Sequence, residues 1–192
     1  MDSNEKKNRI FKATLDLIAK KGFHGASMLS IALKARVAAG TIYTYFKSKE
    51  DLIDALYLHL LEQLDQALLK GFRDNALPEE NLKNIWLQWL FYYVSHPKEF
   101  LFLEQYSASP FISKFILSRK DPRMEPAVEY LSKLKHQGYF KDLPDPILVG
   151  VFYGPIVFMA KTYIADRKKP SVEEATHAFN ACLEAIRRKE GL

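Results

Sequence analysis

The chain has 192 residues, of which 48% are hydrophobic and 27% charged. This composition excludes a chain that is disordered throughout and suffices for a sizeable buried core. The single cysteine, Cys182, excludes an intrachain disulfide and a metal cluster built from several cysteines. The N-terminal segment is polar and charged, without the apolar stretch of a secretory signal. We therefore expect a protein of the cytoplasm.

The net charge of +5 is unevenly distributed. Residues 1–49 contain ten Lys and Arg residues against three acidic residues, a net charge of +7, whereas residues 50–192 carry −2. Such an excess of positive charge in one segment favours a polyanionic partner for that segment. The alternative is a basic face that is simply solvated.

Apolar residues recur with helical spacing through most of the chain, and strand-like alternation does not persist, which predicts an all-α fold. The first helix is expected at residues 4–21, ended by Gly22. Two short helices follow within residues 27–46, with Ser27 as the N-cap of the first. A long helix then begins after Ser48 and extends to about residue 73. One row of its leucines is expected to be buried: Leu52, Leu56, Leu60, Leu64 and Leu68.

Prolines and capping side chains mark the expected starts of the later helices. These starts are Pro78, Pro97, Ser109–Pro110, Glu125–Pro126, Asp145–Pro146 and Ser171, where Glu174 would complete a capping box. The longest apolar segment, residues 146–160, is shorter than the ~20 apolar residues of a membrane span. It predicts a buried helix, and no membrane partner is expected.

The segment 27–46 has the pattern of a helix-turn-helix, with a three-residue turn at 36–38. Ile42 and Phe46 are spaced to bury one side of the second helix against Phe11 and Ile31. Hydroxyl groups and cations on and just after this helix suit contacts with phosphates and base edges. They belong to Thr41, Tyr43, Thr44, Tyr45, Lys47 and Lys49.

Residues 8–56 resemble the DNA-binding signature of TetR-type (TetR/AcrR) transcriptional regulators. The resemblance is carried by Ile31-Ala32 and by the run VAAGTIYTYFKSKEDL at residues 37–52, with support from residues 19–23 and 26–27. It implies a three-helix DNA-binding domain at residues 1–48, followed by a larger helical ligand-binding and dimerisation domain at residues 49–192. It also implies a homodimeric repressor that leaves a palindromic double-stranded DNA operator when a small-molecule effector binds.

The resemblance further implies which residues contact DNA. Ser27 would cap its helix and touch a phosphate. The base edges would be faced by Ala39, Gly40, Thr41 and Thr44. The DNA backbone would be held by Tyr43, Tyr45 and Lys49, with Lys47 nearby.

Three departures from the family pattern are visible in this segment. Arg36 stands where glycine is usual, at a cost of about 1 kcal/mol if the turn requires a left-handed backbone. Ala38 replaces the polar N-cap of the recognition helix, which costs ~1 kcal/mol relative to serine or threonine. Ala39 and Gly40 offer no side-chain hydrogen bonds, so base readout would depend on Thr41 and Thr44, thymine methyl groups and DNA shape. We therefore expect modest sequence discrimination with a large phosphate contribution.

Twenty of the 25 aromatic residues lie beyond residue 50, most densely at residues 85–106. Ligand sites are mostly apolar and aromatic with a few orienting polar groups, so this density favours a pocket for a small apolar or aromatic effector. Ordinary core packing is the alternative for each aromatic residue. The candidate lining residues are Gln63, Trp86, Trp89, Phe100, Leu103, Glu104, Tyr106 and Phe158.

Small residues on the last two long helices predict a dimer interface, because they let helix axes approach closely in a four-helix bundle. Packing within one subunit is the alternative. The candidate interface residues are Gly150, Gly154, Ala175, Ala178, Cys182 and Ala185.

The sequence shows no nucleophile elbow or glycine-rich phosphate loop, and its five histidines lack the spacing of metal ligands. Neither enzymatic activity, a cofactor nor a metal is expected. Another class of function stays open, a helical protein–protein interaction module on a regulator scaffold with weak or lost DNA binding. Arg36 and Ala38 are its support. The sequence also does not distinguish a repressor from an activator.

Overall fold

The computed structural model describes residues 3–107 and 125–188, and the side chains of residues 125–128 are not described. These ranges contain nine α-helices and no strand, so the predicted all-α class is confirmed. A single antiparallel bridge joins Phe140 to Arg187 within the same ranges. The expected helix start at Ser109–Pro110 lies outside the described residues.

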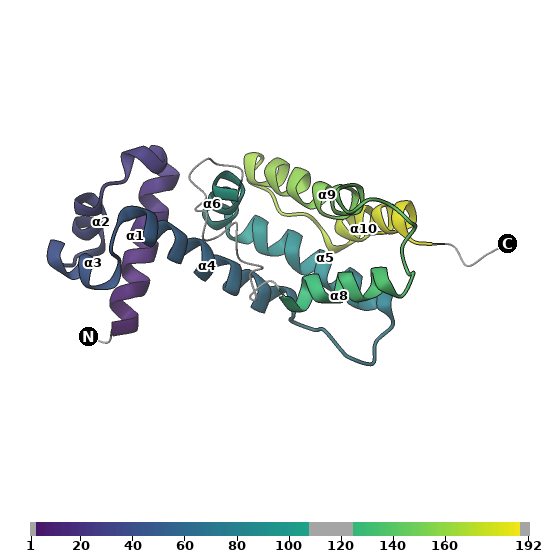
Figure 1. The fold of residues 1–192 in the computed structure, drawn as a ribbon. Coiled ribbons are helices and arrows are strands. Elements are labelled where there is room, and N and C mark those ends of the chain that lie inside the picture. The colour runs from purple at the N-terminus through teal and green to yellow at the C-terminus, as the bar shows by residue number, and fades with distance from the viewer. Residues whose placement is uncertain (1–2, 108–124, 189–192) are drawn as a thin grey trace. The chain divides into compact units, whose positions relative to one another are not determined.

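The helices begin close to where capping residues and prolines predicted them (Figure 1). The long helix ends at Leu68, a few residues earlier than expected, and the last helix ends at Ile186. In chain order the helices are α1 (Ser3–Gly25), α2 (Met28–Ala35), α3 (Ala39–Tyr45), α4 (Lys49–Leu68), α5 (Pro78–Ser95), α6 (Pro97–Ser107), α8 (Glu125–His136), α9 (Asp145–Ala165) and α10 (Val172–Ile186).

The helices form two compact units. Of the described residues, 3–61 and 98–107 belong to the N-terminal unit, and 62–97 and 125–188 to the C-terminal unit. This division differs from the boundary expected between residues 48 and 49, because the N-terminal unit includes the first part of α4 and nearly all of α6. Tyr106 of α6 contacts α4 within this unit: its hydroxyl donates to Asp54, and its ring centroid lies 5.0 Å from that of Tyr57.

The core of the N-terminal unit lies between α1, α2 and α3. Ile10, Ile31 and Ile42, one from each helix, are completely buried. The rings of Phe11 and Phe46 lie 5.6 Å apart, which confirms the predicted packing of the second short helix against Phe11. The predicted leucine row of α4 is also buried along its whole length.

The C-terminal unit is built on α5, α9 and α10, which pack against one another (Figure 1). Trp86 of α5 is completely buried, and its Nε1 donates to the carbonyl oxygen of Phe152 on α9 at 2.9 Å. Its ring centroid lies 6.2 Å from that of Phe179 on α10. Arg187, just after α10, forms a 2.6 Å ion pair with Glu79 near the start of α5.

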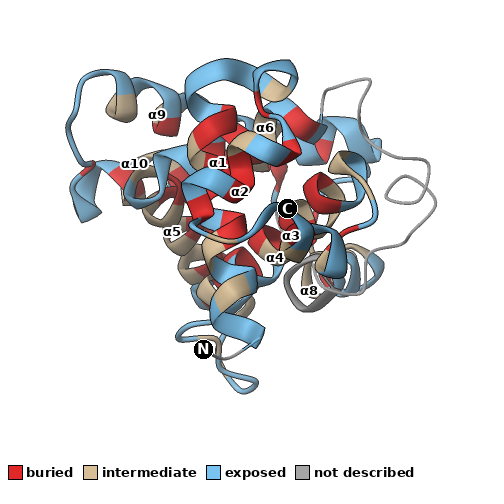
Figure 2. Ribbon diagram, turned by 90° about the vertical axis from the view of Figure 1, so that its left-hand side faces the viewer, coloured by how far each residue is buried: buried red, intermediate tan, exposed pale blue. Residues whose placement is uncertain are grey.

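The expectation that residues 146–160 form a buried helix was wrong for most of α9. Leu148, Phe152, Ile156 and Ala160 are buried, on one face only, and the remaining positions are exposed or half-buried (Figure 2). An 18-residue stretch of this helix has a mean hydropathy of 1.6, enough by length and composition to cross a membrane, yet only 22% of that stretch is buried within the chain. The error arose because α9 is apolar on all sides, so its sequence does not distinguish the packed face from the uncovered one.

Candidate nucleic-acid interface

The first helix of the helix-turn-helix, α2, begins with a capping box. The Ser27 hydroxyl accepts from the backbone N–H of Ser30 at 3.1 Å, and the Ser30 hydroxyl accepts from the backbone N–H of Ser27 at 3.0 Å. The prediction that Ser27 caps this helix is therefore confirmed. Ser27 is exposed beside the positive end of the α2 dipole, so the cap presents a hydroxyl where an anion is favoured.

The turn between α2 and α3 contains two of the departures from the family pattern, Arg36 and Ala38. Arg36 adopts the left-handed conformation, with φ 55° and ψ 48°. Ala38 is the N-cap of α3 and provides no side-chain hydrogen bond to it. The guanidinium of Arg9 on α1 compensates in part, because its Nη2 donates to the carbonyl oxygens of Ala35 at 2.5 Å and Arg36 at 2.9 Å.

Substitution of Arg36 or Ala38 is expected to increase the stability of the fold. Arg36→Gly is expected to raise the free energy of unfolding by about 1 kcal/mol by relieving the left-handed backbone. Ala38→Ser is expected to add a similar ~1 kcal/mol by capping α3. Urea unfolding followed by circular dichroism measures both changes. Arg167→Gly is the matched control, because Arg167 has the same φ of 55° after α9. A loss of stability in Arg36→Gly, with a gain in Arg167→Gly, would contradict the strain argument.

The second helix, α3, exposes three of the four residues that were expected to face base edges and one, Tyr43, that was expected to hold the DNA backbone. Ala39, Gly40, Tyr43 and Thr44 are exposed, and Tyr43 is 57% accessible despite its aromatic ring. No described atom lies within 4 Å of the position a Cβ would take at Gly40. The backbone of α3 at Gly40 can therefore come into direct contact with another molecule.

Two of the predicted DNA contacts, Thr44 and Tyr45, also form side-chain hydrogen bonds within the chain. The Thr44 hydroxyl donates to the Thr41 carbonyl oxygen at 2.6 Å, which leaves the Thr44 oxygen free to accept from a base amino group. The Tyr45 hydroxyl lies 3.2 Å from the Ser3 hydroxyl at the start of α1. Thr41 and Tyr45 are half-buried, so they contribute less exposed surface than Tyr43 and Thr44.

The start of α4 completes the surface. The Ser48 hydroxyl accepts from the backbone N–H of Asp51 at 3.2 Å, and the Asp51 carboxylate accepts from the backbone N–H of Lys47 at 2.8 Å. Hydrogen bonds from its own backbone N–H and from Ser48 lower the pKa of Glu50. Lys47 is exposed and Lys49 half-buried beside this capped terminus. Two cations therefore follow directly after α3, as a contact with the DNA backbone requires.

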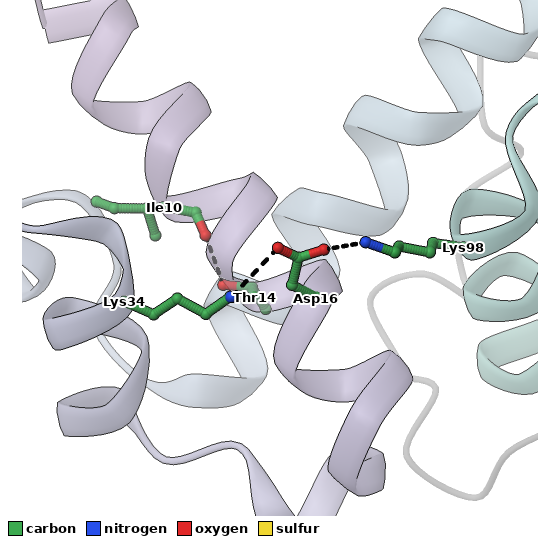
Figure 3. Close-up of polar contacts among 5 residues, drawn as sticks. All are labelled: Ile10, Thr14, Asp16, Lys34 and Lys98. Atoms are coloured by element: carbon green, nitrogen blue, oxygen red, sulfur yellow. Dashed lines mark hydrogen bonds and ion pairs between the residues drawn. The ribbon is translucent and has the colours of Figure 1, made fainter.

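Asp16 of α1 joins two helices of the N-terminal unit, a role that sequence analysis did not predict. Lys98 of α6 reaches it at 2.5 Å and Lys34 of α2 at 3.4 Å (Figure 3). The hydrogen bond from Lys98 is the main reason that the pKa of Asp16 is lowered, and the bond from Lys34 adds to it. The same interaction raises the pKa of Lys98. Spacing along the chain gives no signal for this cluster, because its members are far apart in sequence.

Asp16 predicts a pH-dependent contribution to stability. Its pKa is lower in the folded state than the usual 3.8, so the stabilisation is present above that value and is lost as the pH falls through the folded pKa. Asp16→Asn is expected to lower the melting temperature at pH 7, by an amount that shrinks below about pH 4. Lys98→Met should cost more than Lys34→Met, because Lys98 is closer. A melting-temperature difference that stays constant between pH 3 and pH 7 would contradict this account.

The candidate pocket residues are divided between the two units. Phe100, Leu103, Glu104 and Tyr106 lie on α6 in the N-terminal unit, where all but Glu104 are buried. The others belong to the C-terminal unit: Gln63, which is exposed, Trp86 and Trp89, which are buried, and Phe158. Phe158 corrects the expectation, since 72% of it is accessible on the uncovered side of α9.

The candidate dimer residues are also divided. Gly150, Gly154 and Ala185 are exposed and Ala178 is half-buried, so these four remain candidates. Ala175 and Cys182 are buried within the chain, which corrects their assignment to a surface between subunits. They point into the unit because α10 packs on α5 and α9 through this side. Burial also raises the pKa of the Cys182 thiol.

Comparison with known proteins agrees with this geometry. The family model described as bacterial regulatory proteins, tetR family, matches residues 10–56. A helix-turn-helix-type transcriptional regulator of Haemophilus influenzae is 33% identical over 102 residues, 53% of this chain and 54% of that protein, so the match spans about half of the relative's length. A TetR-family regulator from Marinobacter aquaeolei superposes with a TM-score of 0.88 over 97% of both chains, at 24% identity. A TetR-family protein from Vibrio parahaemolyticus gives 0.78 over 96% of this chain and all of the other, at 27% identity.

The capped α2, the left-handed turn at Arg36 and the exposed α3 define a helix-turn-helix protein. The family match falls on this segment, and the similarity of fold extends over nearly the whole chain. Residues 10–56 therefore match the DNA-binding segment of the tetR family of bacterial regulatory proteins, and nearly the whole chain has the fold of solved TetR-family regulators.

Proposed function

We propose that this protein is a ligand-responsive, DNA-binding transcriptional repressor of the cytoplasm, which acts as a homodimer on a palindromic operator. The observation that carries the proposal is the surface of α3. It exposes Gly40, Tyr43 and Thr44 in helix-turn-helix geometry, directly before Lys47 and Lys49. The concentration of positive charge in residues 1–49 supports the same function.

In this proposal α3 enters the major groove. Thr44 accepts from a base amino group, and Ala39 and the Thr methyl groups contact thymine methyl groups. Ser27, Tyr43, Tyr45, Lys47 and Lys49 hold the phosphates. Because few side chains read bases directly, each wrong base pair is expected to cost no more than ~3 kcal/mol.

The proposed dimer uses the uncovered side of α9. Ile147, Gly150, Gly154 and Phe158 follow one another at intervals of three and four residues, which places them on one helix face. Ile147 and Phe158 are 49% and 72% accessible, and no described atom lies within 4 Å of a Cβ at either glycine. Exposed apolar side chains around glycines favour close packing against the same helix of a second copy. Ala178 and Ala185 of α10 would contribute to the same bundle, and this interface accounts for the apolar face without a membrane.

The proposed response to an effector depends on α4 and α6. Residues of α4 belong to both units, and α6 follows α5 with only His96 between them. Lys98 and Tyr106 tie α6 to Asp16 and Asp54 in the N-terminal unit. An effector that binds the C-terminal unit can thus act on the DNA-binding helices through these two elements. To change the operator-competent fraction from 99% to 1%, it must bind the two forms with affinities that differ by about 10⁴-fold.

The test is the salt dependence of DNA binding. Fluorescence anisotropy of a labelled duplex measures the dissociation constant at several salt concentrations. The logarithm of the association constant should fall linearly with the logarithm of salt concentration, with a slope of about −0.9 for each phosphate neutralised. Absence of DNA binding at low salt, with the dimer intact, would favour the protein–protein interaction module instead.

A further inference from the structure

Two buried polar atoms of the C-terminal unit have no hydrogen-bond partner in the described part of the chain. They are Oδ1 of Asp65 on α4 and Nε1 of Trp89 on α5. The two residues are only 9% and 7% accessible. Buried polar groups in native proteins are nearly always paired, since an unpaired one loses its hydration without compensation. These two unpaired buried atoms therefore require a functional explanation.

Two hydrogen-bonded contacts define how the segment that follows α4 is paired with α5. The side-chain amide of Asn84 donates to the Lys70 carbonyl oxygen at 2.6 Å, and that of Asn81 donates to the Arg73 carbonyl oxygen at 2.8 Å. Arg73, the later residue of the first segment, is thus paired with the earlier residue of α5, Asn81, so the two segments are antiparallel. Asp65 precedes Lys70 by five residues and Trp89 follows Asn84 by five, so the same antiparallel register, continued along α4 and α5, brings Asp65 opposite Trp89.

Aromatic rings of α5 and α9 lie around Trp89. The ring centroid of Trp89 lies 4.9 Å from that of Tyr153 on α9, and the Tyr93 and Tyr153 hydroxyls lie 3.0 Å apart. Trp86, one turn earlier on α5, provides a contrast because its N–H is bonded to the Phe152 carbonyl oxygen. Trp89 thus differs from the other buried tryptophan of the same helix in the one atom that can orient a ligand.

No basic side chain pairs with Asp65 among the residues that the structure describes. Burial raises the pKa of Asp65, and no neighbouring charge contributes to that shift. A buried carboxylate oxygen without a partner is best matched by a cationic donor, because a charge-assisted hydrogen bond satisfies both its charge and its lone pairs. The Asp65 carboxylate would repel an anionic ligand group placed next to it.

We infer that the effector is an organic amine with an aromatic or similarly apolar body, whose ammonium group donates to Asp65 Oδ1 while the indole N–H of Trp89 donates to an acceptor atom of the same ligand. This inference rests on the proposed function and names the chemical class of its effector. The inferred site includes Trp89, which was a candidate pocket residue in the sequence analysis, and Asp65, which was not. The body of the ligand packs against the Trp89 and Tyr153 rings.

Three probes of matched size test the inference: 2-phenylethylammonium, the neutral 2-phenylethanol and the anion phenylacetate. Isothermal titration calorimetry on the full chain measures their binding. The ammonium probe is expected to bind at least about tenfold more tightly than the other two, and Asp65→Asn should remove that preference. Equal binding of the three probes, binding of none, or an undiminished preference in Asp65→Asn would overturn the inference.

The tryptophans supply a matched pair of variants. Trp89→Phe is expected to weaken binding of the ammonium probe severalfold and to lower the melting temperature less than Trp86→Phe does, since both variants lose packing but the Trp89 N–H has no hydrogen bond to lose. Trp86→Phe should lower the melting temperature, because it removes the bond to Phe152, but leave binding of the probe nearly unchanged. The reverse pattern would contradict the assignment. Asp65→Asn keeps the side-chain size, and its melting temperature is expected to equal or exceed that of the unmodified protein.

DNA binding is measured separately on the same preparations. A protein that binds DNA but does not distinguish the three probes disproves the effector class and leaves the proposed function intact. A protein that binds the ammonium probe through Asp65 but has no affinity for DNA disproves the proposed function instead.

Discussion

Gly40→Glu is expected to weaken DNA binding by at least 100-fold, about 2.7 kcal/mol, without weakening the fold. Gly40 lies in the first turn of α3 with no described atom near the position of a Cβ, and its φ is not positive. A glutamate there improves helix propensity by roughly 0.5–1 kcal/mol and interacts favourably with the helix dipole. The same carboxylate would enter the major groove beside the phosphates. Anisotropy titration and urea unfolding measure the two opposite effects.

Gly40→Gln separates the bulk of the added side chain from its charge. It is expected to bind DNA less tightly than the unmodified protein but more tightly than Gly40→Glu, with the difference between the two variants decreasing as salt screens the charge. If Gly40→Glu bound DNA as tightly as the unmodified protein, α3 would not be the element that enters the groove.

Phe158→Asp is expected to raise the dissociation constant of the dimer by at least about 100-fold. Phe158 is 72% accessible in the single chain, so the substitution removes little internal packing. In the proposed dimer the new carboxylate would be buried without a partner, which costs several kcal/mol. Sedimentation velocity at several protein concentrations measures the change. Operator affinity should fall as well, because one half-site contributes fewer contacts than two.

Leu77→Asp is the matched control for Phe158→Asp. Leu77 precedes α5 and is 68% accessible, so the change in charge and in exposed apolar surface is similar. It should leave the dimer intact. If both variants dissociate the dimer to the same extent, or neither does, then α9 is not the interface.

Local backbone rules account for the features that sequence predicted well. Ser27 caps α2 and Ala38 leaves α3 without a side-chain cap, each as its residue type and position indicated. The leucine row of α4 is buried because leucines four residues apart lie on the same face of a helix, and that face is turned toward the core. Such features depend on a few neighbouring residues, so a single sequence contains the information.

Features set by packing between distant helices were not predictable in the same way. Phe158 has the composition of a pocket residue, and only the packing of α9 on α5 and α10 shows that it lies on the uncovered face. Cys182 was assigned to an interface because it is small, yet α10 buries it within the unit. Asp65 was missed because an acidic residue among leucines is usually solvated, and its burial follows from contacts outside its own helix.

The most direct test of the central proposal is selection of binding sites from random double-stranded DNA by the purified protein at moderate salt, followed by sequencing. A dimer with two recognition helices predicts an enriched palindrome whose half-sites are centred about one helical turn, 10–10.5 base pairs, or a multiple of it apart. Gly40→Glu should enrich nothing under the same conditions. Failure of the unmodified dimer to enrich any sequence would contradict the proposal that this protein is an operator-binding regulator.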